Sequence, residues 1–291
     1  MGQESSVVIT TFTDPMMGLS YECEPVFRKL ETHFPGTVQF RYAMAVLVRD
    51  VYEFVDRDDL REGKETAIRN YNARLAKIYE SEESITGMPI NMTAFRLFST
   101  EHTSSLPLNL AYHAARAAAP KLADLFLYNL RYATIVDCRP TTRQEEILAV
   151  VRKTGINETA FRKRCEDGYA QAALARDLEL ARKLEIHTLP AYLIQYQEKR
   201  ILIRDLIGYD AFVTAIAQVS DNAIKPRAAD QSKDALHSLL EAHPLISPIE
   251  VREAMDLQKT EEVRTLIQPM LDRGEIAIET IHHGWFIRKA R

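Results

Sequence analysis

The sequence predicts an α/β domain with a large all-helical insertion, followed by a small α+β domain. Extended, amphipathic and again extended segments occupy residues 7–12, 20–34 and 37–47, which is a βαβ opening. Apolar residues then repeat at helical spacing for more than a hundred residues before a hairpin signal. Residues 221–232 are polar and aperiodic, so we expect them to link a domain at 1–220 to a second one at 233–291.

Turn signals bound the elements of the opening. The run at 7–12 is β-branched and aromatic and ends at Asp14-Pro15, as expected of a strand buried on both faces. The next segment keeps apolar residues at helical spacing from 20 to 34 and stops at Pro35-Gly36. Alternation over 37–47 predicts the second strand.

A helical insertion is expected over about 55–184. Pro, Gly or Asn separates its helical segments, which lie near 65–80, 107–118, 120–135, 142–153 and 158–184. Thr188-Leu189-Pro190 then precedes a hairpin with strands at 191–196 and 201–203, where a proline at the strand entry does least harm to the ladder. An amphipathic helix at 209–219 closes the domain.

The C-terminal segment has the outline of a winged helix. Helices are expected at 233–242, 247–256 and 260–273, and a hairpin follows with strands at 276–278 and 285–287. Residues 232–291 carry eight basic and ten acidic residues, and the helix that would enter a DNA groove begins Thr260-Glu261-Glu262. Because DNA binding relies on Lys and Arg to neutralise phosphates, we expect dimerisation, or docking through Trp285 and Phe286, rather than nucleic acid binding.

Composition and cysteine spacing indicate the cellular compartment and argue against some classes of function. Lys+Arg 37 against Asp+Glu 41 gives a formal charge of −4, which is not the balance of a dedicated nucleic-acid binder. The cysteines Cys23, Cys138 and Cys165 are odd in number and show no metal-ligand spacing, so we expect a reducing compartment and no metal. The start lacks a basic segment typical of a signal peptide, and no apolar run would span a bilayer. These features predict a cytoplasmic protein without membrane contact.

Three local patterns carry a family resemblance. Asp14-Pro15 followed by Glu24-Pro25 keeps a characteristic spacing of two proline pairs, and Ser104-Ser105-Leu106-Pro107 opens a helix rich in small residues. Thr188-Leu189-Pro190 stands before the hairpin. In this order they resemble the DsbA-like, FrnE-type branch of the thioredoxin superfamily. The resemblance implies a thioredoxin fold over residues 1–220, a cis-proline loop at Pro190, and ancestry among thiol-disulfide oxidoreductases and isomerases.

This chain departs from the family at the two residues that carry out the family's redox chemistry. Its two redox cysteines correspond to Met17 and Ser20, so the motif here is Met17-Gly18-Leu19-Ser20. A thioether has no proton to lose, and an unactivated hydroxyl does not form a mixed disulfide. Dithiol exchange is therefore excluded at this site unless another thiol substitutes, and whether the chain is an enzyme stays open.

The resemblance leaves a ligand groove in place. It would lie between Met17, Gly18 and Leu19 on one side and Thr188, Leu189 and Pro190 on the other, and the backbone of Leu189 would hold an extended peptide or a small thiol such as glutathione. We expect a redox-inactive or altered member that binds such a ligand, with His187 at the rim. No cofactor is predicted apart from glutathione as a candidate.

Two other hypotheses stay open. The first is an enzyme. Ser20 is first of all a candidate N-cap, but it could donate a hydrogen bond to a bound thiol in a glutathione-dependent transferase or isomerase. Cys23, one helical turn beyond Ser20, is the candidate substitute thiol for a redox enzyme, whereas Cys138 and Cys165 are interpreted as structural.

The second hypothesis is a regulator. The first domain would bind a ligand and so control nucleic-acid contact by the C-terminal segment.

Overall fold

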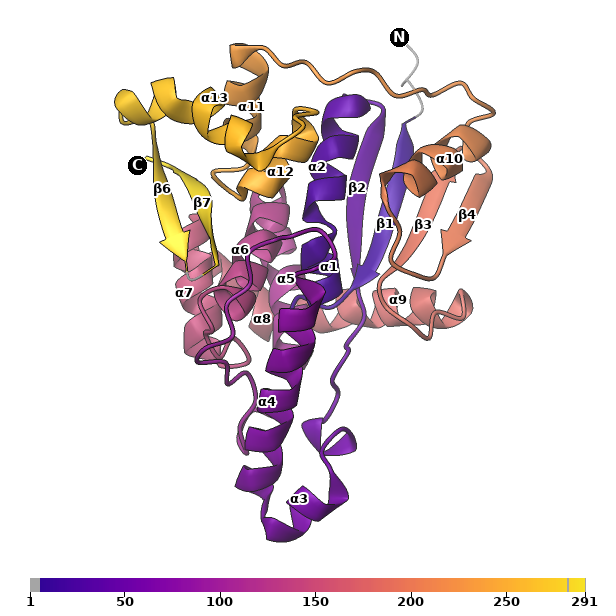
Figure 1. Cartoon of the computed structure of the whole chain (residues 1–291). Coiled ribbons are helices and arrows are strands. Elements are labelled where there is room, and N and C mark those ends of the chain that lie inside the picture. The colour runs from indigo at the N-terminus through magenta and orange to yellow at the C-terminus, as the bar shows by residue number, and fades with distance from the viewer. Residues whose placement is uncertain (1–5, 282, 291) are drawn as a thin grey trace.

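A four-stranded mixed sheet organises the N-terminal two thirds of the chain. The computed structural model describes residues 6–281 and 283–290 (Figure 1). The strands are β1 (Val7–Thr13), β2 (Val38–Met44), β3 (Ala191–Tyr196) and β4 (Lys199–Ile203), in the order β2-β1-β3-β4. The β1–β2 pair is parallel, and the other two pairs are antiparallel. The predicted βαβ opening and hairpin are both confirmed, with β4 beginning earlier than expected.

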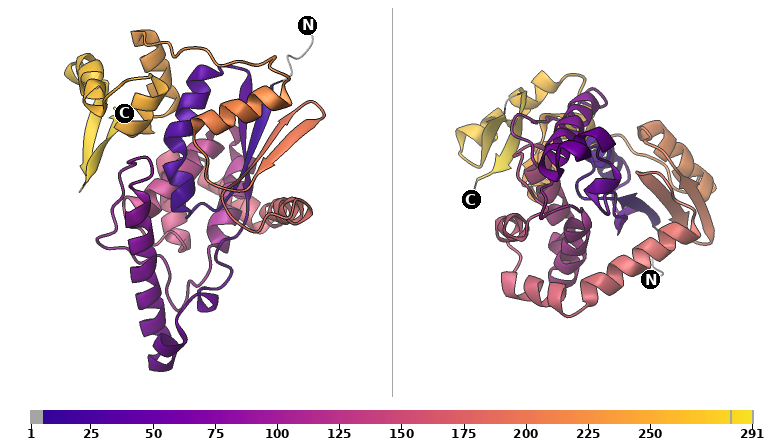
Figure 2. Two further views of the ribbon diagram at one scale, coloured as in Figure 1. Left: turned by 45° about the vertical axis from the view of Figure 1, so that its right-hand side comes forward. Right: turned by 90° about the horizontal axis from the view of Figure 1, so that it is seen from below.

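The helix predicted at 20–34 is two helices. They are α1 (Gly18–Glu22) and α2 (Glu24–His33), separated at Cys23. Pro25 lies in the first turn of α2. It has no backbone N–H to donate to a carbonyl of the preceding turn, so α1 does not continue into α2 as one helix. With α10 (Tyr209–Val219), α2 covers one face of the sheet, and Phe27, Phe212 and Tyr192 pack there as a group of aromatic rings. Figure 2 shows α10 lying across the strands.

The helical insertion covers the other side of the sheet and extends beyond it. Its helices are α3 (Arg57–Glu62), α4 (Lys64–Glu82), α5 (Leu106–Ala118), α6 (Ala123–Ile135), α7 (Gln144–Thr154), α8 (Glu158–Glu166) and α9 (Tyr169–Lys183). The expected single helix at 158–184 breaks at Gly168, whose φ of 79° is a left-handed conformation that favours glycine. In Figure 1, α3 and α4 project from the body of the molecule, and we call this pair the finger.

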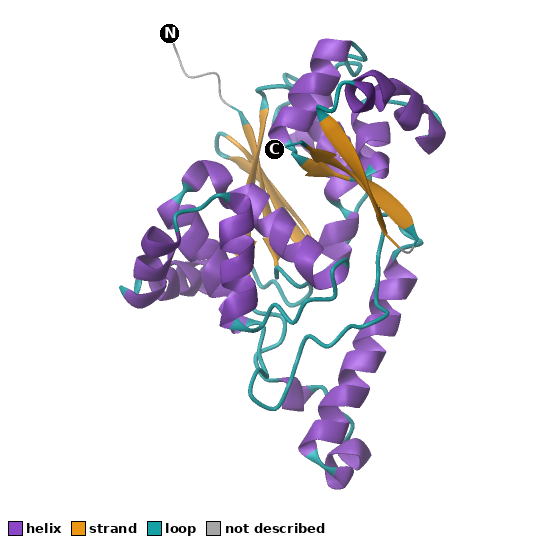
Figure 3. Cartoon of the chain, turned by 90° about the vertical axis from the view of Figure 1, so that its left-hand side faces the viewer, coloured by secondary structure: helices purple, strands orange, loops and turns teal. Residues whose placement is uncertain are grey.

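The C-terminal segment folds as three helices and a small sheet. Its elements are α11 (Lys233–Ala242), β5 (Leu245–Ile246), α12 (Pro248–Ala254), α13 (Thr260–Asp272), β6 (Ile276–Ile281) and β7 (Gly284–Lys289). The strand order is β5-β7-β6, and Figure 3 shows this sheet apart from the larger one. The predicted helices and hairpin are present; β5 was not predicted because two residues carry no period.

This segment is joined to the rest of the molecule by a shared core. The Phe286 ring lies 4.8 Å from the Tyr132 ring of α6, edge to face, and the side chain of Phe286 is fully buried. Tyr128 donates a hydrogen bond of 2.7 Å to Glu250 of α12. Docking through Phe286 is therefore as expected, whereas Trp285 packs within its own segment.

None of the helices described is long and apolar enough to cross a membrane.

Candidate functional site

A buried aspartate organises the end of the sheet where the candidate site lies. Asp14 is fully buried, and its Oδ2 accepts hydrogen bonds from the Leu47 N–H at 2.9 Å, Ser105 Oγ at 2.6 Å and Asn109 Nδ2 at 2.8 Å. Burial raises the pKa of Asp14 while these donors lower it. The carboxyl thus ties the loop after β1 to the end of β2 and the start of α5. Two of the motifs that carried the family resemblance meet here.

The residues in the positions of the redox pair lie below the surface. Met17 is the N-cap of α1 and is 6% exposed, and Ser20 is 1% exposed. Ser20 Oγ accepts a hydrogen bond of 2.7 Å from Thr13 Oγ1, to which Arg131 also donates at 3.1 Å. The reading of Ser20 as an N-cap is wrong, because α1 begins two residues earlier. Leu19 alone of residues 17–20 is partly exposed.

Helix α4 covers the start of α1. Tyr79 Oη donates a hydrogen bond of 2.5 Å to the Met16 carbonyl. A methyl group on Gly18 would lie 1.9 Å from Glu82 Oε2 and 2.7 Å from Tyr79 Cδ1, so only glycine allows this approach. Burial raises the pKa of Glu82 to about 7. Sequence reasoning missed Tyr79 and Glu82, because nothing local in the sequence relates them to residues 16–18.

None of the three cysteines is an activated thiol. Cys23 is 1% exposed, its Sγ lies 2.9 Å from Tyr192 Oη, and burial raises its pKa to about 12. Burial also raises the pKa values of Cys138 and Cys165. Cys138 Sγ contacts the Asn91 carbonyl at 2.8 Å. Because the thiolate is the nucleophile, all three are poor candidates for exchange at neutral pH.

The cis-proline loop borders an open cavity. The Leu189–Pro190 peptide bond is cis, and Pro190 is buried while Thr188 is exposed. The cavity is about 520 Å³ and is lined by the segment that follows β2, by α9 and by residues 186–189, including His187. Phe12 pairs with Ala191, so the loops after β1 and before β3 lie at the same end of the sheet.

Only one half of the expected groove borders this cavity. Thr188 and Leu189 line it, but Met17, Gly18 and Leu19 do not. The rest of its lining includes Ala45 and Leu47 beyond β2 and Ala181 of α9. This cavity is therefore bordered by the loop at 186–189 but not by residues 17–19.

A buried cluster of charged side chains joins the domain of the larger sheet, the helical insertion and the C-terminal segment. Arg131 of α6 is fully buried and contacts Glu24 of α2 at 2.7 Å, and Arg28 contacts the same carboxylate at 2.8 Å. Arg28 Nε also lies 3.5 Å from Glu250 of α12. Glu250 completes a capping box with Ser247, the one part of this cluster with a sequence signal. The charges are mutually paired, so we assign the cluster a structural role.

Metal ligation has no support in the described residues, where no group of three His, Cys, Asp or Glu side chains could hold an ion.

Known proteins are similar to this chain in sequence or in fold. A ClpXP adapter protein SpxH from Halalkalibacterium halodurans is 20% identical over 96% of this chain and 88% of its own length. The cytosolic disulfide reductase DsbM from Pseudomonas aeruginosa has a TM-score of 0.53 at 19% identity, covering 72% of this chain and 98% of that one. A candidate protein disulfide isomerase from Nitrosomonas europaea has a TM-score of 0.57 at 14% identity, covering 74% and 96%.

The family model described as thioredoxin matches residues 10–214. The match runs from β1 to α10 and includes the whole insertion, and the two structural neighbours are similar to this chain in fold. The chain belongs to the thioredoxin family.

Proposed function

We propose that this chain is a protein-binding adapter that delivers a client protein to the ClpXP protease and performs no thiol-disulfide exchange. The observation that carries the proposal is the covered start of α1, where Met17 replaces the nucleophile and α4 closes over Gly18. The relatives that match over nearly the whole chain bear the name ClpXP adapter. A fold that binds polypeptides and has lost its nucleophile is suited to binding alone.

The state of the cysteines supports the proposed loss of thiol-disulfide exchange. A mixed disulfide needs a thiolate that is accessible to the disulfide of its substrate. Cys23 fails both conditions, with 1% exposure and a pKa of about 12. Its Sγ is held against Tyr192 in the core of the domain.

The surface that we propose for the client includes the cis-proline loop. Within the described residues, no hydrogen bond is made by the backbone of Thr188 or Leu189. These groups are free to pair with an extended peptide, and the cavity of about 520 Å³ beside them offers apolar side chains at Leu47 and Ala181. A peptide is the ligand this arrangement favours.

A glutathione enzyme using Ser20 is less well supported. Its Oγ is buried and already accepts the Thr13 hydroxyl, so a thiol at the surface has no path to it. We also propose that residues 233–291 brace the fold rather than bind nucleic acid. Glu261 and Glu262 are exposed at the start of α13, and Phe286 is committed to the shared core. We place the protein in the cytoplasm, in keeping with three free cysteines.

Reconstituted proteolysis tests the proposal. Purified ClpX and ClpP are incubated with a cell extract and ATP, with and without this chain, and protein half-lives are measured by mass spectrometry. We expect at least one protein to be degraded several-fold faster only when the chain is present. No accelerated protein, together with insulin reduction by the native chain, would overturn the proposal and restore the oxidoreductase reading.

A further inference from the structure

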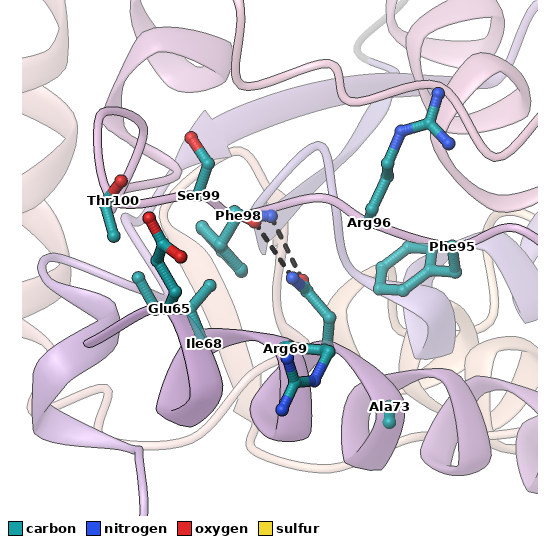
Figure 4. Close-up of a pocket in the computed structure, with 10 residues that line it drawn as sticks. Glu65, Ile68, Arg69, Ala73, Phe95, Arg96, Phe98, Ser99 and Thr100 are labelled. Carbon is teal, nitrogen blue, oxygen red and sulfur yellow. Dashed lines mark hydrogen bonds between the residues drawn. The ribbon is translucent and has the colours of Figure 1, made fainter. Parts of the chain in front are cut away.

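A second groove lies on the finger, away from the cis-proline loop. It has a volume of about 480 Å³ and runs between α4 and the extended segment 95–100 (Figure 4). The Asn72 amide holds this segment against the helix: its Nδ2 donates to the Phe98 carbonyl at 2.9 Å, and its Oδ1 accepts from the Phe98 N–H at 3.1 Å. The groove is thus built by a fixed pair of elements rather than by a loop resting on the surface.

The floor of the groove is apolar and firmly packed. Ile68 and Phe98 are 2% and 3% exposed and lie in the core of the insertion. The half-buried ring of Phe95 is held edge to face by Tyr79, with ring centroids 5.4 Å apart. An apolar side chain entering the groove would therefore meet preformed aromatic and aliphatic walls.

The groove carries two arginines that lack an acidic partner. Arg69 and Arg96 are exposed, and neither forms an ion pair within the described residues, where Arg69 has only a 3.4 Å contact to the Thr66 hydroxyl. Figure 4 shows their guanidinium groups on opposite sides of the groove, with Glu65 nearer its other end beside Thr100. By contrast, Arg61 on the same finger is paired with Asp58.

The edge of the groove also offers backbone groups. Neither the N–H nor the C=O of Arg96 is hydrogen-bonded within the described residues. An extended chain lying along segment 95–98 could pair with them, as peptides do when they add to a free strand edge. Its apolar side chain would face Phe95 and Phe98 while its acidic neighbours faced Arg69 and Arg96.

We propose that this groove binds an extended segment of the client protein in which an apolar residue is flanked by Asp or Glu. The inference rests on the proposed adapter function and adds a second contact surface to it. Charge complementarity selects this occupant. The guanidinium groups of Arg69 and Arg96 attract carboxylates, and the apolar floor between them accepts the apolar side chain of the residue that the carboxylates flank.

A peptide array on the full chain tests the groove. Fluorescein-labelled peptides carry one central Leu, Ile, Phe or Tyr with Asp or Glu at every spacing on both sides, and each has an Asn/Gln counterpart. We expect acidic peptides to bind at least about tenfold more tightly than their amide counterparts, and Arg69→Gln with Arg96→Gln to abolish the difference. The matched control, Arg57→Gln with Arg61→Gln, removes the same charge from α3 and should bind as the native chain does.

Three results would overturn the inference. They are equal binding of acidic and amide peptides, unchanged binding by the Arg69/Arg96 variant, and a dimer that this variant dissociates, which would assign the groove to a second copy of the chain. The proteolysis assay separates this failure from that of the proposed function. If a client is degraded equally well with the Arg69/Arg96 variant, the adapter function is retained and the groove has no part in it. If no client is degraded faster with the native chain, the adapter function itself is refuted.

Discussion

Alkylation of Cys23 by iodoacetamide should be slow in the folded protein. Its pKa of about 12 leaves the thiol protonated until strongly alkaline pH. At pH 8 about one molecule in 10,000 would carry the thiolate, against about one in four for an ordinary cysteine with a pKa near 8.5. Ionisation alone therefore slows the reaction about 2,000-fold, and the 1% exposure of the side chain slows it further.

The assay is a time course followed by peptide mapping. The reference is the same cysteine in the chain unfolded in concentrated guanidinium chloride, and the partly exposed Cys165 reports reagent activity in the folded sample. Tyr192→Phe removes the hydrogen bond that lowers the Cys23 pKa, so direct labelling should not become faster. Labelling of native Cys23 within about tenfold of the unfolded rate would refute the reasoning and restore it as a redox thiol.

Three further predictions concern buried residues of α1 and of the charge cluster. Gly18→Ala should destabilise the fold by about 1–3 kcal/mol, since its methyl group would collide with Tyr79, whereas Gly208→Ala, with open space around it, should be nearly neutral in urea unfolding. Burial raises the pKa of Glu22 to about 8, so its stabilising contribution is complete below about pH 4 and is lost as the pH rises to 8. Between pH 5 and 8 the stability of Glu22→Gln relative to the native chain should therefore rise by on the order of 3 kcal/mol in thermal melts, and parallel curves would contradict this. Arg131→Met should cost about 3 kcal/mol because Glu24 keeps only Arg28, and adding Glu24→Gln should recover part of the loss; a loss below about 1 kcal/mol would show that the pair is dispensable.

Sequence reasoning was most accurate for features that depend on residues close together in the chain. The helix at 209–219 and the three C-terminal helices follow periods of a few residues and were predicted within a few residues at each end. The cis bond before Pro190 followed from the family resemblance. The break at Cys23 was missed although Pro25 marked it, because the apolar spacing continues across the two helices.

The groove shows where local reasoning stops. Thr188 and Leu189 border a cavity whose lining includes Ala45 and Leu47 but not Met17 or Gly18. Helix α4 lies against Gly18, although it begins more than forty residues further along the chain. Neither its amphipathic pattern nor the presence of a glycine at position 18 reveals which surface the helix covers.

The sequence by itself determined the fold class, the order of its elements and the missing nucleophile at Met17, because backbone periodicity and the identity of a side chain are local properties. The tertiary structure alone decided that Ser20 is inaccessible, that Cys23 keeps its proton and that Arg69 and Arg96 flank one groove. Burial, pKa and charge complementarity depend on atoms that only packing brings together, from β1, α4, α6 and the loops between them.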